Sequence, residues 1–245
     1  MIIDILTLFP GFFVSPLTEG IACRGIEKGR IKVRIFNLRD FAADRHRTVD
    51  DRPFGGGAGM ILKPDPIVRA LHLLKGLPGP TPWVILLTPQ GIPLKQARVK
   101  ELVDSSRRLI LICGRYEGVD DRIGDFFCDE QMSIGDYVLG GGEPAALVVL
   151  DAVIRLIPEV MGCADSGKEE SFEEDLLEYP QYTRPREFKG YRVPDVLFSG
   201  DHEKIRAWRR RQAMDRTLKR RPNLIREDRL SPDDLVVLKS LKIKK

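Results

Sequence analysis

An arginine close to a run of acids is the first candidate for chemistry in this sequence. Arg155 is the single cation in the apolar, helix-like stretch 143–157, and residues 165–178 beyond it carry seven acids against one lysine. A carboxylate that takes a proton as general base, with an arginine stabilising the resulting oxyanion, is a standard way to activate an amide-like nucleophile. From the spacing alone, an ordinary ion pair explains Arg155 better.

Positive charge is concentrated in the C-terminal part of the chain. Residues 201–221 contain nine lysines and arginines against three acids. Such a segment can neutralise several backbone phosphates, and from charge alone nucleic acid and a solvated helix face are about equally supported. A second candidate contact is the long polar stretch 40–59, for which a flexible loop is an equal alternative. There a glycine-rich turn follows four basic residues, Arg45, His46, Arg47 and Arg52.

Three turn-rich segments stand next to apolar runs. Residues 114–118 follow the run 109–113, residues 88–91 follow the run 83–87, and residues 133–142 end on three consecutive glycines. Ligands of open α/β sheets bind beyond the carboxyl ends of the strands, where glycine lets the backbone approach them closely. Each segment alone is equally compatible with a tight turn, but together the three predict a ligand site.

Alternating strand and helix patterns must position these segments. Apolar, β-branched runs predict strands at residues 1–8, 31–36, 83–87 and 109–113, and helical patterns are predicted at 12–21, 64–74, 93–103 and 143–157. This alternation predicts an α/β protein with a largely parallel sheet. No GxGxxG motif follows the first strand, so the sequence lacks the signature of a Rossmann dinucleotide-binding fold. Asp201 and the segment 231–234 predict the starts of two further helices, and hence a small helical C-terminal domain.

Composition excludes several other classes of protein. With 42% hydrophobic and 31% charged residues, the chain has the composition of an ordinary globular protein. Asp151 and Arg155 interrupt its longest apolar stretch, so no membrane contact is predicted. Four cysteines without CxxC spacing disfavour a disulfide framework and fit a reduced, cytoplasmic setting. Three widely spaced histidines give no support to a zinc site, and no metal site is predicted.

The order of motifs resembles that of the bacterial tRNA (guanine-N1)-methyltransferases, the TrmD family of the SPOUT class of S-adenosylmethionine-dependent RNA methyltransferases. The resemblance runs essentially end to end, and so many motifs in the right order are highly specific. It rests on FPGFF (9–13), VDDRPFGGGAGM (49–60), TPQG (88–91), GRYEGVDDR (114–122), SIGDYVLGGGE (133–143), ESF (170–172), YPQYTRP (179–185) and the arginine-rich segment around Trp208.

The resemblance implies a fold and an assembly that composition could not indicate. Residues 1–160 are expected to form a catalytic domain with a deep trefoil knot that binds S-adenosylmethionine. Residues 161–178 are expected to be an acidic mobile linker, and residues 179–245 a basic helical domain that binds tRNA. The family forms a homodimer with its active site at the subunit interface. Generic topology rules exclude knots, so no periodicity argument would have predicted one.

The same resemblance assigns residues to the site. The cofactor is expected at the three loops, against Leu87, Gly114, Tyr116, Glu117, Ile134, Gly135, Asp136, Tyr137, Val138, Leu139, Gly141 and Gly142. The RNA is expected to contact His46, Arg47, Asp51, Gly55, Gly57, Gly59, Arg184, Arg209 and Arg210. By analogy with the family, magnesium is a candidate auxiliary ion, although the sequence displays no dedicated site for it.

The implied reaction is methylation of N1 of the guanosine 3′ of the anticodon, position 37 of tRNA. A linker carboxylate removes the N1 proton in this family, and an arginine faces the guanine O6. Glu170 and Arg155 match these two positions. Glu170 departs from the family, which usually has aspartate before Ser-Phe, and the longer side chain requires a shift of the linker. A second departure is Glu143 before Pro144, where the family tends to have leucine.

Two alternative functions remain open from the sequence. A SPOUT methyltransferase acting on another RNA site would bind the same cofactor, and only the identity of the methylated nucleotide separates it from the first hypothesis. A non-catalytic tRNA-binding protein would bind RNA without affinity for S-adenosylmethionine. The departure at Glu170 is what keeps this second alternative open.

Overall fold

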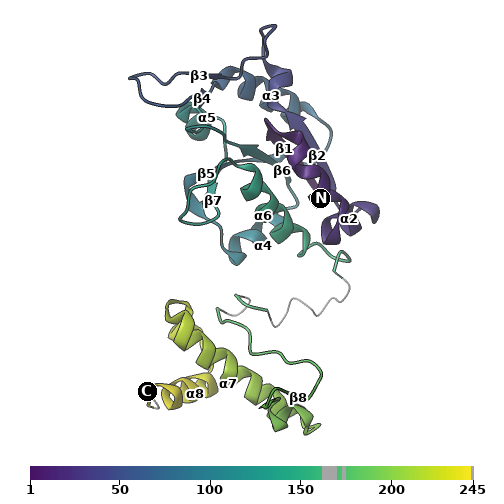
Figure 1. Ribbon diagram of the computed structural model, residues 1–245, viewed down its shortest axis with the longest axis vertical. Coiled ribbons are helices and arrows are strands. Elements are labelled where there is room, and N and C mark those ends of the chain that lie inside the picture. The colour runs from purple at the N-terminus through teal and green to yellow at the C-terminus, as the bar shows by residue number, and fades with distance from the viewer. Residues whose placement is uncertain (162–169, 173–174, 244–245) are drawn as a thin grey trace. The chain divides into compact units, whose positions relative to one another are not determined.

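The computed structural model describes residues 1–161, 170–172 and 175–243. The chain divides into two units, Met1–Ala164 and Asp165–Lys245, each with internal contacts of its own (Figure 1). The first unit contains the five-stranded parallel sheet with its helices, and the second contains the helices α7 (His202–Arg220) and α8 (Pro232–Ile243). No helix among the described residues combines the length and apolar character needed to cross a bilayer.

A five-stranded sheet lies at the centre of the first unit. Each neighbouring pair of strands is parallel, which confirms the predicted α/β architecture with a largely parallel sheet. Parallel pairing places the carboxyl ends of adjacent strands at the same edge of the sheet. In spatial order the strands are β2 (Lys32–Asn37), β1 (Ile2–Thr7), β6 (Arg108–Cys113), β5 (Pro82–Pro93) and β7 (Glu130–Ser133).

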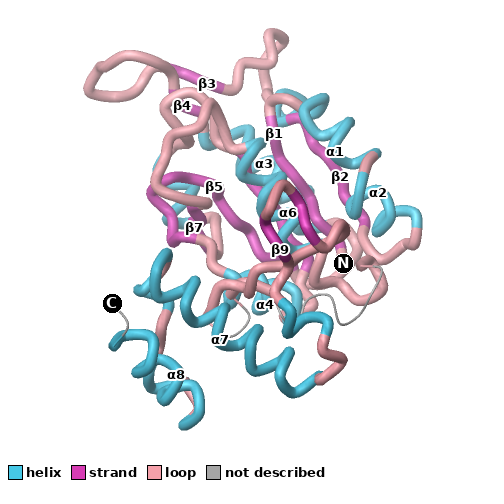
Figure 2. Tube along the Cα trace, turned by 60° about the horizontal axis from the view of Figure 1, so that its bottom comes forward, coloured by secondary structure: helices cyan, strands magenta, loops and turns pink. Residues whose placement is uncertain are grey.

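Hydrophobic side chains fill both faces of this sheet. On β5, Ile85 and Leu87 belong to one core cluster, whereas Val84 and Leu86 belong to another, as the two-residue repeat of a strand requires. The first cluster includes side chains of α2 (Gly20–Glu27), α4 (Gln96–Asp104) and α6 (Glu143–Ile154), and the second includes those of α3 (Pro64–Gly76) and α5 (Asp121–Phe126). Helices therefore flank the strands (Figure 2), which explains why β6 is buried throughout.

Several element boundaries differ from the sequence prediction. Helix α6 ends at Ile154 rather than at 157, so Arg155 is its C-cap residue. Helix α4 starts at Gln96 because Pro93 is the last residue of β5. The N-terminal helical stretch is divided into α1 (Val14–Thr18) and α2. Neither α5 nor β7 was predicted, because both are short and neither carries a long apolar run.

The second unit is built on α7 (His202–Arg220) and α8 (Pro232–Ile243). Both predicted helix starts are confirmed. The Asp201 carboxylate accepts hydrogen bonds from the backbone of Glu203 and Lys204, and the Ser231 hydroxyl accepts one from the Asp234 N–H at 3.1 Å. Such caps satisfy backbone donors that lack a partner within the helix. A small core joins the helices and contains Leu176, Ala213, Met214, Leu238 and Leu241.

Candidate active site

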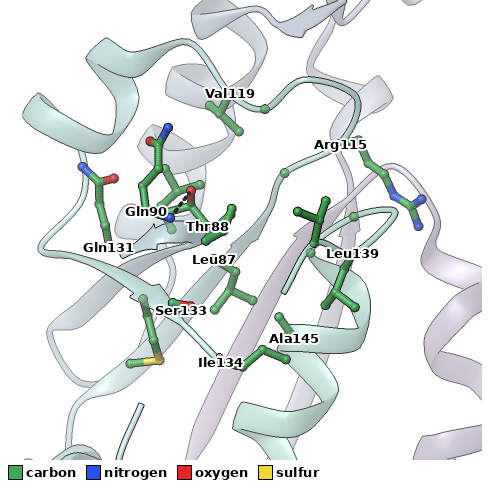
Figure 3. Close-up of a pocket in the computed structure, with 18 of the residues that line it drawn as sticks. Leu87, Thr88, Gln90, Arg115, Val119, Gln131, Ser133, Ile134, Leu139 and Ala145 are labelled. Carbon is green, nitrogen blue, oxygen red and sulfur yellow. Dashed lines mark hydrogen bonds between the residues drawn. The ribbon is translucent and has the colours of Figure 1, made fainter. Parts of the chain in front are cut away.

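The three loops singled out in the sequence surround one pocket at the carboxyl edge of the sheet (Figure 3). The loops after β6 and β7 supply most of the wall, and residues of β5, β7, α5 and α6 supply the rest. The cavity has a volume of about 300 Å³, at the lower end of the roughly 300–1,000 Å³ typical of small-molecule sites. Its lining includes every predicted cofactor residue except Asp136: Leu87, Gly114, Tyr116, Glu117, Ile134, Gly135, Tyr137, Val138, Leu139, Gly141 and Gly142.

The third loop, residues 88–91, is not the strand-end turn that the sequence predicts. Leu87 and Ile92 both pair with Met132 of β7, so the residues between them bulge out of a strand that continues to Pro93. Gly91 is required at the base of this bulge, because a Cβ atom there would lie 2.3 Å from the Met132 backbone nitrogen. Thr88, Pro89 and Gln90 line the pocket. The bulge turns the middle of β5 into part of the site.

Backbone contact between two of the loops closes one side of the pocket. The Gly142 N–H donates a hydrogen bond to the Gly114 carbonyl at 2.8 Å. A Cβ atom on Gly142 would lie 2.7 Å from the Cys113 Cα and 2.9 Å from the Gly114 nitrogen. Side chains other than hydrogen therefore cannot occupy position 142 unless the loops separate. Burial holds the pKa of the adjacent Cys113 thiol well above its ordinary value, which disfavours the reactive thiolate form.

We expect Gly142→Ala to destabilise the first unit, because the added methyl group overlaps with backbone atoms of the neighbouring loop. Overpacking of this kind costs roughly 1–3 kcal/mol of unfolding free energy. Gly140→Ala is the matched control, because its Cβ atom would have no neighbour closer than 3.9 Å. Denaturant unfolding of both variants checks this prediction. Equal stability of the two would show that the loops separate at no cost.

A partly buried ion pair that the sequence did not predict supports the glycine-rich loop. Arg115 Nε donates to Glu143 Oε2 at 2.8 Å, and its Nη1 donates to the Gly140 carbonyl at 2.8 Å. Glu143 is fully buried and accepts a second hydrogen bond from the Thr7 hydroxyl at 2.6 Å. The Arg115 guanidinium also lies 4.4 Å from the centre of the Phe9 ring. The pair links the loops after β6 and β7 to the end of β1.

The residues of the pocket fit an adenosine-like ligand. Leu87, Ile134, Leu139 and Ala145 give it apolar walls (Figure 3), which suit a flat purine base. Glycines at 114, 135, 141 and 142 add no side chains to the lining, so a ligand can approach the backbone of the loops closely. A Cβ atom at Gly141 would lie 2.2 Å from Arg115 Nε, so a larger residue there would displace the Arg115 side chain from its contacts with Glu143 and Gly140.

Part of the predicted RNA-binding loop lies against the pocket. The Glu117 N–H donates to the Met60 carbonyl at 3.0 Å, and a Cβ atom on Gly59 would lie 2.3 Å from Glu117 Oε1. Gly55 and Gly57 are exposed with positive φ, as a tight loop requires. Within the loop, β3 (Asp50–Asp51) pairs antiparallel with β4 (Ile61–Leu62), and this hairpin was not predicted.

The polar residues of the same loop are exposed. Asp51 accepts a hydrogen bond from the Arg52 N–H, and His46 and Arg47 follow a turn at Asp44. The Arg47 guanidinium lies 3.3 Å from an Asp40 carboxylate oxygen. Exposure on both sides makes such a pair weak, so Arg47 can exchange it for a phosphate at little cost.

The three RNA-binding candidates of the second unit differ in their surroundings. Arg184 is exposed, and the Arg209 guanidinium lies 4.7 Å from the centre of the Tyr179 ring. Arg210 makes two hydrogen bonds with Asp234, at 2.9 and 2.8 Å, and this pair holds the pKa of the Asp234 carboxyl below its ordinary value. The contact ties α7 to α8, and the RNA contact expected of Arg210 stays a prediction.

The two predicted catalytic residues are both partly buried, and they belong to different units. Arg155 lies at the end of α6 in the first unit and Glu170 lies in the second. Their roles in catalysis stay predictions. The acids at 165 and 169, which are alternative bases, lie outside the described residues. Within the described ranges, no group of three or more His, Cys, Asp or Glu side chains could hold a metal ion, and magnesium assistance stays a prediction.

The fold and the pocket define an α/β protein with a cavity of small-molecule size at the carboxyl edge of a parallel sheet. Comparison with known proteins makes the assignment specific, because the family model of tRNA (Guanine-1)-methyltransferase TrmD matches residues 1–227. The chain therefore belongs to the TrmD family.

Close relatives cover nearly the whole chain. A tRNA (guanine-N(1)-)-methyltransferase of Dictyoglomus turgidum is 49% identical over 98% of this chain and 96% of its own length. A protein of the same name from Geotalea uraniireducens is 51% identical over 97% of this chain and 96% of its own. A third, from Gloeobacter violaceus, is 53% identical over 92% of this chain and 98% of its own.

Proposed function

We propose that this protein transfers a methyl group from S-adenosylmethionine to N1 of guanosine 37 in tRNA, the nucleotide 3′ of the anticodon. The observation that carries the proposal is the match at about half identity, over almost the full length of both chains, to relatives named tRNA (guanine-N(1)-)-methyltransferase. Position 37 follows from the resemblance of the motifs. The pocket at the three glycine-rich loops adds independent support, because it suits the adenosine part of the cofactor.

We propose the SPOUT arrangement for the fold, in which residues 1–160 contain a deep trefoil knot. The bond between Gly142 and Gly114 supports this proposal, because it brings the loop after β7 against the loop after β6. We assign residues 161–178 to a linker and residues 179–245 to a basic domain that binds tRNA. A cytoplasmic location accords with this substrate.

The position of Arg155 supports a homodimer with the active site between subunits. Helix α6 starts beside the pocket, where Ala145 is part of the lining, and Arg155 follows its other end. Ten residues of helix separate Arg155 from Ala145 by about 15 Å along the axis. An arginine needed at the target base is therefore distant from the pocket of its own protomer. Two copies related by a two-fold axis would let Arg155 of one protomer serve the pocket of the other.

The chemistry requires deprotonation of the target base. When bound, S-adenosylmethionine supplies an electrophilic methyl group on a positively charged sulfur. Guanine N1 carries a proton at neutral pH and becomes nucleophilic only when that proton leaves. In the proposed mechanism Glu170 accepts this proton as general base. Arg155 donates hydrogen bonds to the guanine O6, where the negative charge develops. Arg115 and Glu143 position the loop that holds the cofactor.

Nucleoside analysis of the product tests this function against both alternatives. Unmodified tRNA is incubated with the protein and S-adenosylmethionine, digested to nucleosides and examined by mass spectrometry. We expect 1-methylguanosine, absent when the protein is omitted. A different methylated nucleoside would favour a SPOUT enzyme for another RNA site. An unmethylated tRNA that nevertheless binds the protein would favour a non-catalytic tRNA-binding protein.

A further inference from the structure

A short β-hairpin in the second unit presents two aromatic rings on one face. β8 (Glu187–Phe188) pairs antiparallel with β9 (Tyr191–Arg192), and Phe188 lies directly opposite Tyr191. The two turn residues between them have φ of 51° and 81°. Two positive φ values are typical of the type I′ turn, which suits a tight hairpin. Opposite residues of an antiparallel pair share a face, so both rings lie on the same side of the hairpin.

Both rings of this pair are open to solvent. Phe188 is 62% exposed and Tyr191 is 82% exposed. The other face of the hairpin carries an ion pair, in which Arg192 Nε lies 3.4 Å from Glu187 Oε2. This pair links the two strands without covering the rings. A two-stranded hairpin this short has little stability of its own, so exposure of its two apolar side chains does not serve folding.

Positive charge surrounds the exposed rings. Residues 184–192 contain four lysines and arginines against one acid. The Lys189 ammonium lies 5.5 Å from the centre of the Phe188 ring, next to the open face. Arg186 is 3.0 Å from Asp195 and packs over the Phe198 ring at 4.1 Å, which holds the base of the hairpin.

Aromatic faces beside cations have a specific chemical preference. Unpaired bases stack on aromatic rings while cations neutralise the neighbouring phosphates. An RNA duplex has no free base faces, and an apolar peptide would gain nothing from the excess of positive charge. The combination therefore favours a single-stranded segment of nucleic acid.

We propose that Phe188 and Tyr191 form a stacking platform for unpaired nucleotides of the RNA substrate, with Lys189 at an adjacent phosphate. The inference rests on the proposed function for the identity of the substrate. The platform would be a further binding surface for the unpaired part of the RNA. Its residues are separate in sequence from those of the cofactor pocket.

A double variant, Phe188→Leu with Tyr191→Leu, tests the platform, because leucine keeps the apolar character and removes the ring faces. The dissociation constant is measured at one fixed salt concentration for an unmodified tRNA transcript and for a fully paired RNA duplex. We expect the Kd for tRNA to rise roughly 5- to 150-fold, the loss that removal of one base–aromatic stacking contact produces. The Kd for the duplex and for S-adenosylmethionine should not change.

Phe126→Leu is the matched control, because Phe126 is 75% exposed in the first unit and is not part of the hairpin. It should leave the Kd for tRNA unchanged. A separate variant, Lys189→Gln, removes one expected phosphate contact. The slope of log Kd against log salt concentration should therefore fall by about 0.7 to 0.9.

Three results would overturn the platform. They are an unchanged Kd for tRNA in the double variant, an equal loss for tRNA and duplex, and dissociation of the protein into smaller species in sedimentation experiments. The last result would assign the rings to a protein–protein contact. Because RNA binding is measured without methyl transfer, a wild-type protein that binds tRNA but fails to methylate it would refute the proposed function and leave this test intact.

Discussion

Replacing Glu170 with glutamine is expected to lower the rate of methyl transfer roughly 10²- to 10⁴-fold, the contribution of a typical general base. Glutamine keeps the size and polarity of the side chain but cannot accept the proton from guanine N1. Affinity for S-adenosylmethionine should stay near normal, because the proposed role of Glu170 is toward guanine N1 and not toward the cofactor. Single-turnover rates with saturating tRNA, measured beside calorimetric titration of the cofactor, check both parts of the prediction.

Glu170→Asp is the informative control for this experiment. It restores the residue that the family usually has, so it should keep a substantial part of the wild-type rate. A Glu170→Gln variant with near wild-type turnover would contradict the assignment and transfer the role of base to the acids at 165 or 169.

Arg155→Ala is expected to reduce the rate roughly 10²- to 10³-fold, as loss of one oxyanion donor does in other enzymes. The negative charge that accumulates on the guanine O6 would then lack its partner. Arg155→Lys keeps the positive charge but loses the planar pair of donors, so it should recover only part of the rate. Comparison of kcat at saturating tRNA with KM separates this loss from weaker substrate binding.

Mixing two inactive variants tests whether Arg155 serves the pocket of the partner. Leu139→Arg introduces a bulky charge at a partly exposed residue of the pocket lining and should abolish cofactor binding. If this variant and Arg155→Ala exchange subunits at random, half of the dimers are mixed and each contains one intact site. We therefore expect about a quarter of the wild-type activity. Activity no higher than that of the separate variants would place Arg155 and the pocket of one active site in the same protomer.

The sequence was informative about the sheet because the physical signals there are strong. A strand buried on both faces reads as a continuous apolar run, as in β6, and such runs alternate with helical segments along the chain. Asp201 and Ser231 marked helix starts because capping depends on residue type at one position. The short elements α5 and β7 lack such signals, since the six residues of α5 span fewer than two helical turns and the four residues of β7 include no continuous apolar run.

The pocket could be located but not completed from the sequence. Turn-rich segments next to apolar runs indicated the loops of the pocket. The bulge at 88–91 was not predicted, because it depends on pairing with Met132, which is distant in the chain. Arg115 was missed because its partner Glu143 is 28 residues away, and neither spacing nor residue type links the two. The pairing of Arg210 with Asp234 was missed for the same reason, and the RNA contact expected of Arg210 stays a prediction.

Methyl transfer to two matched tRNA transcripts tests the central claim most directly. One transcript has guanosine at position 37 and the other has adenosine there, and both are incubated with the protein and S-adenosylmethionine labelled on its methyl group. We expect label in the guanosine transcript only. Equal label in both transcripts would contradict methylation of guanosine 37, and no label in either, despite binding of tRNA, would contradict the assignment of an enzyme.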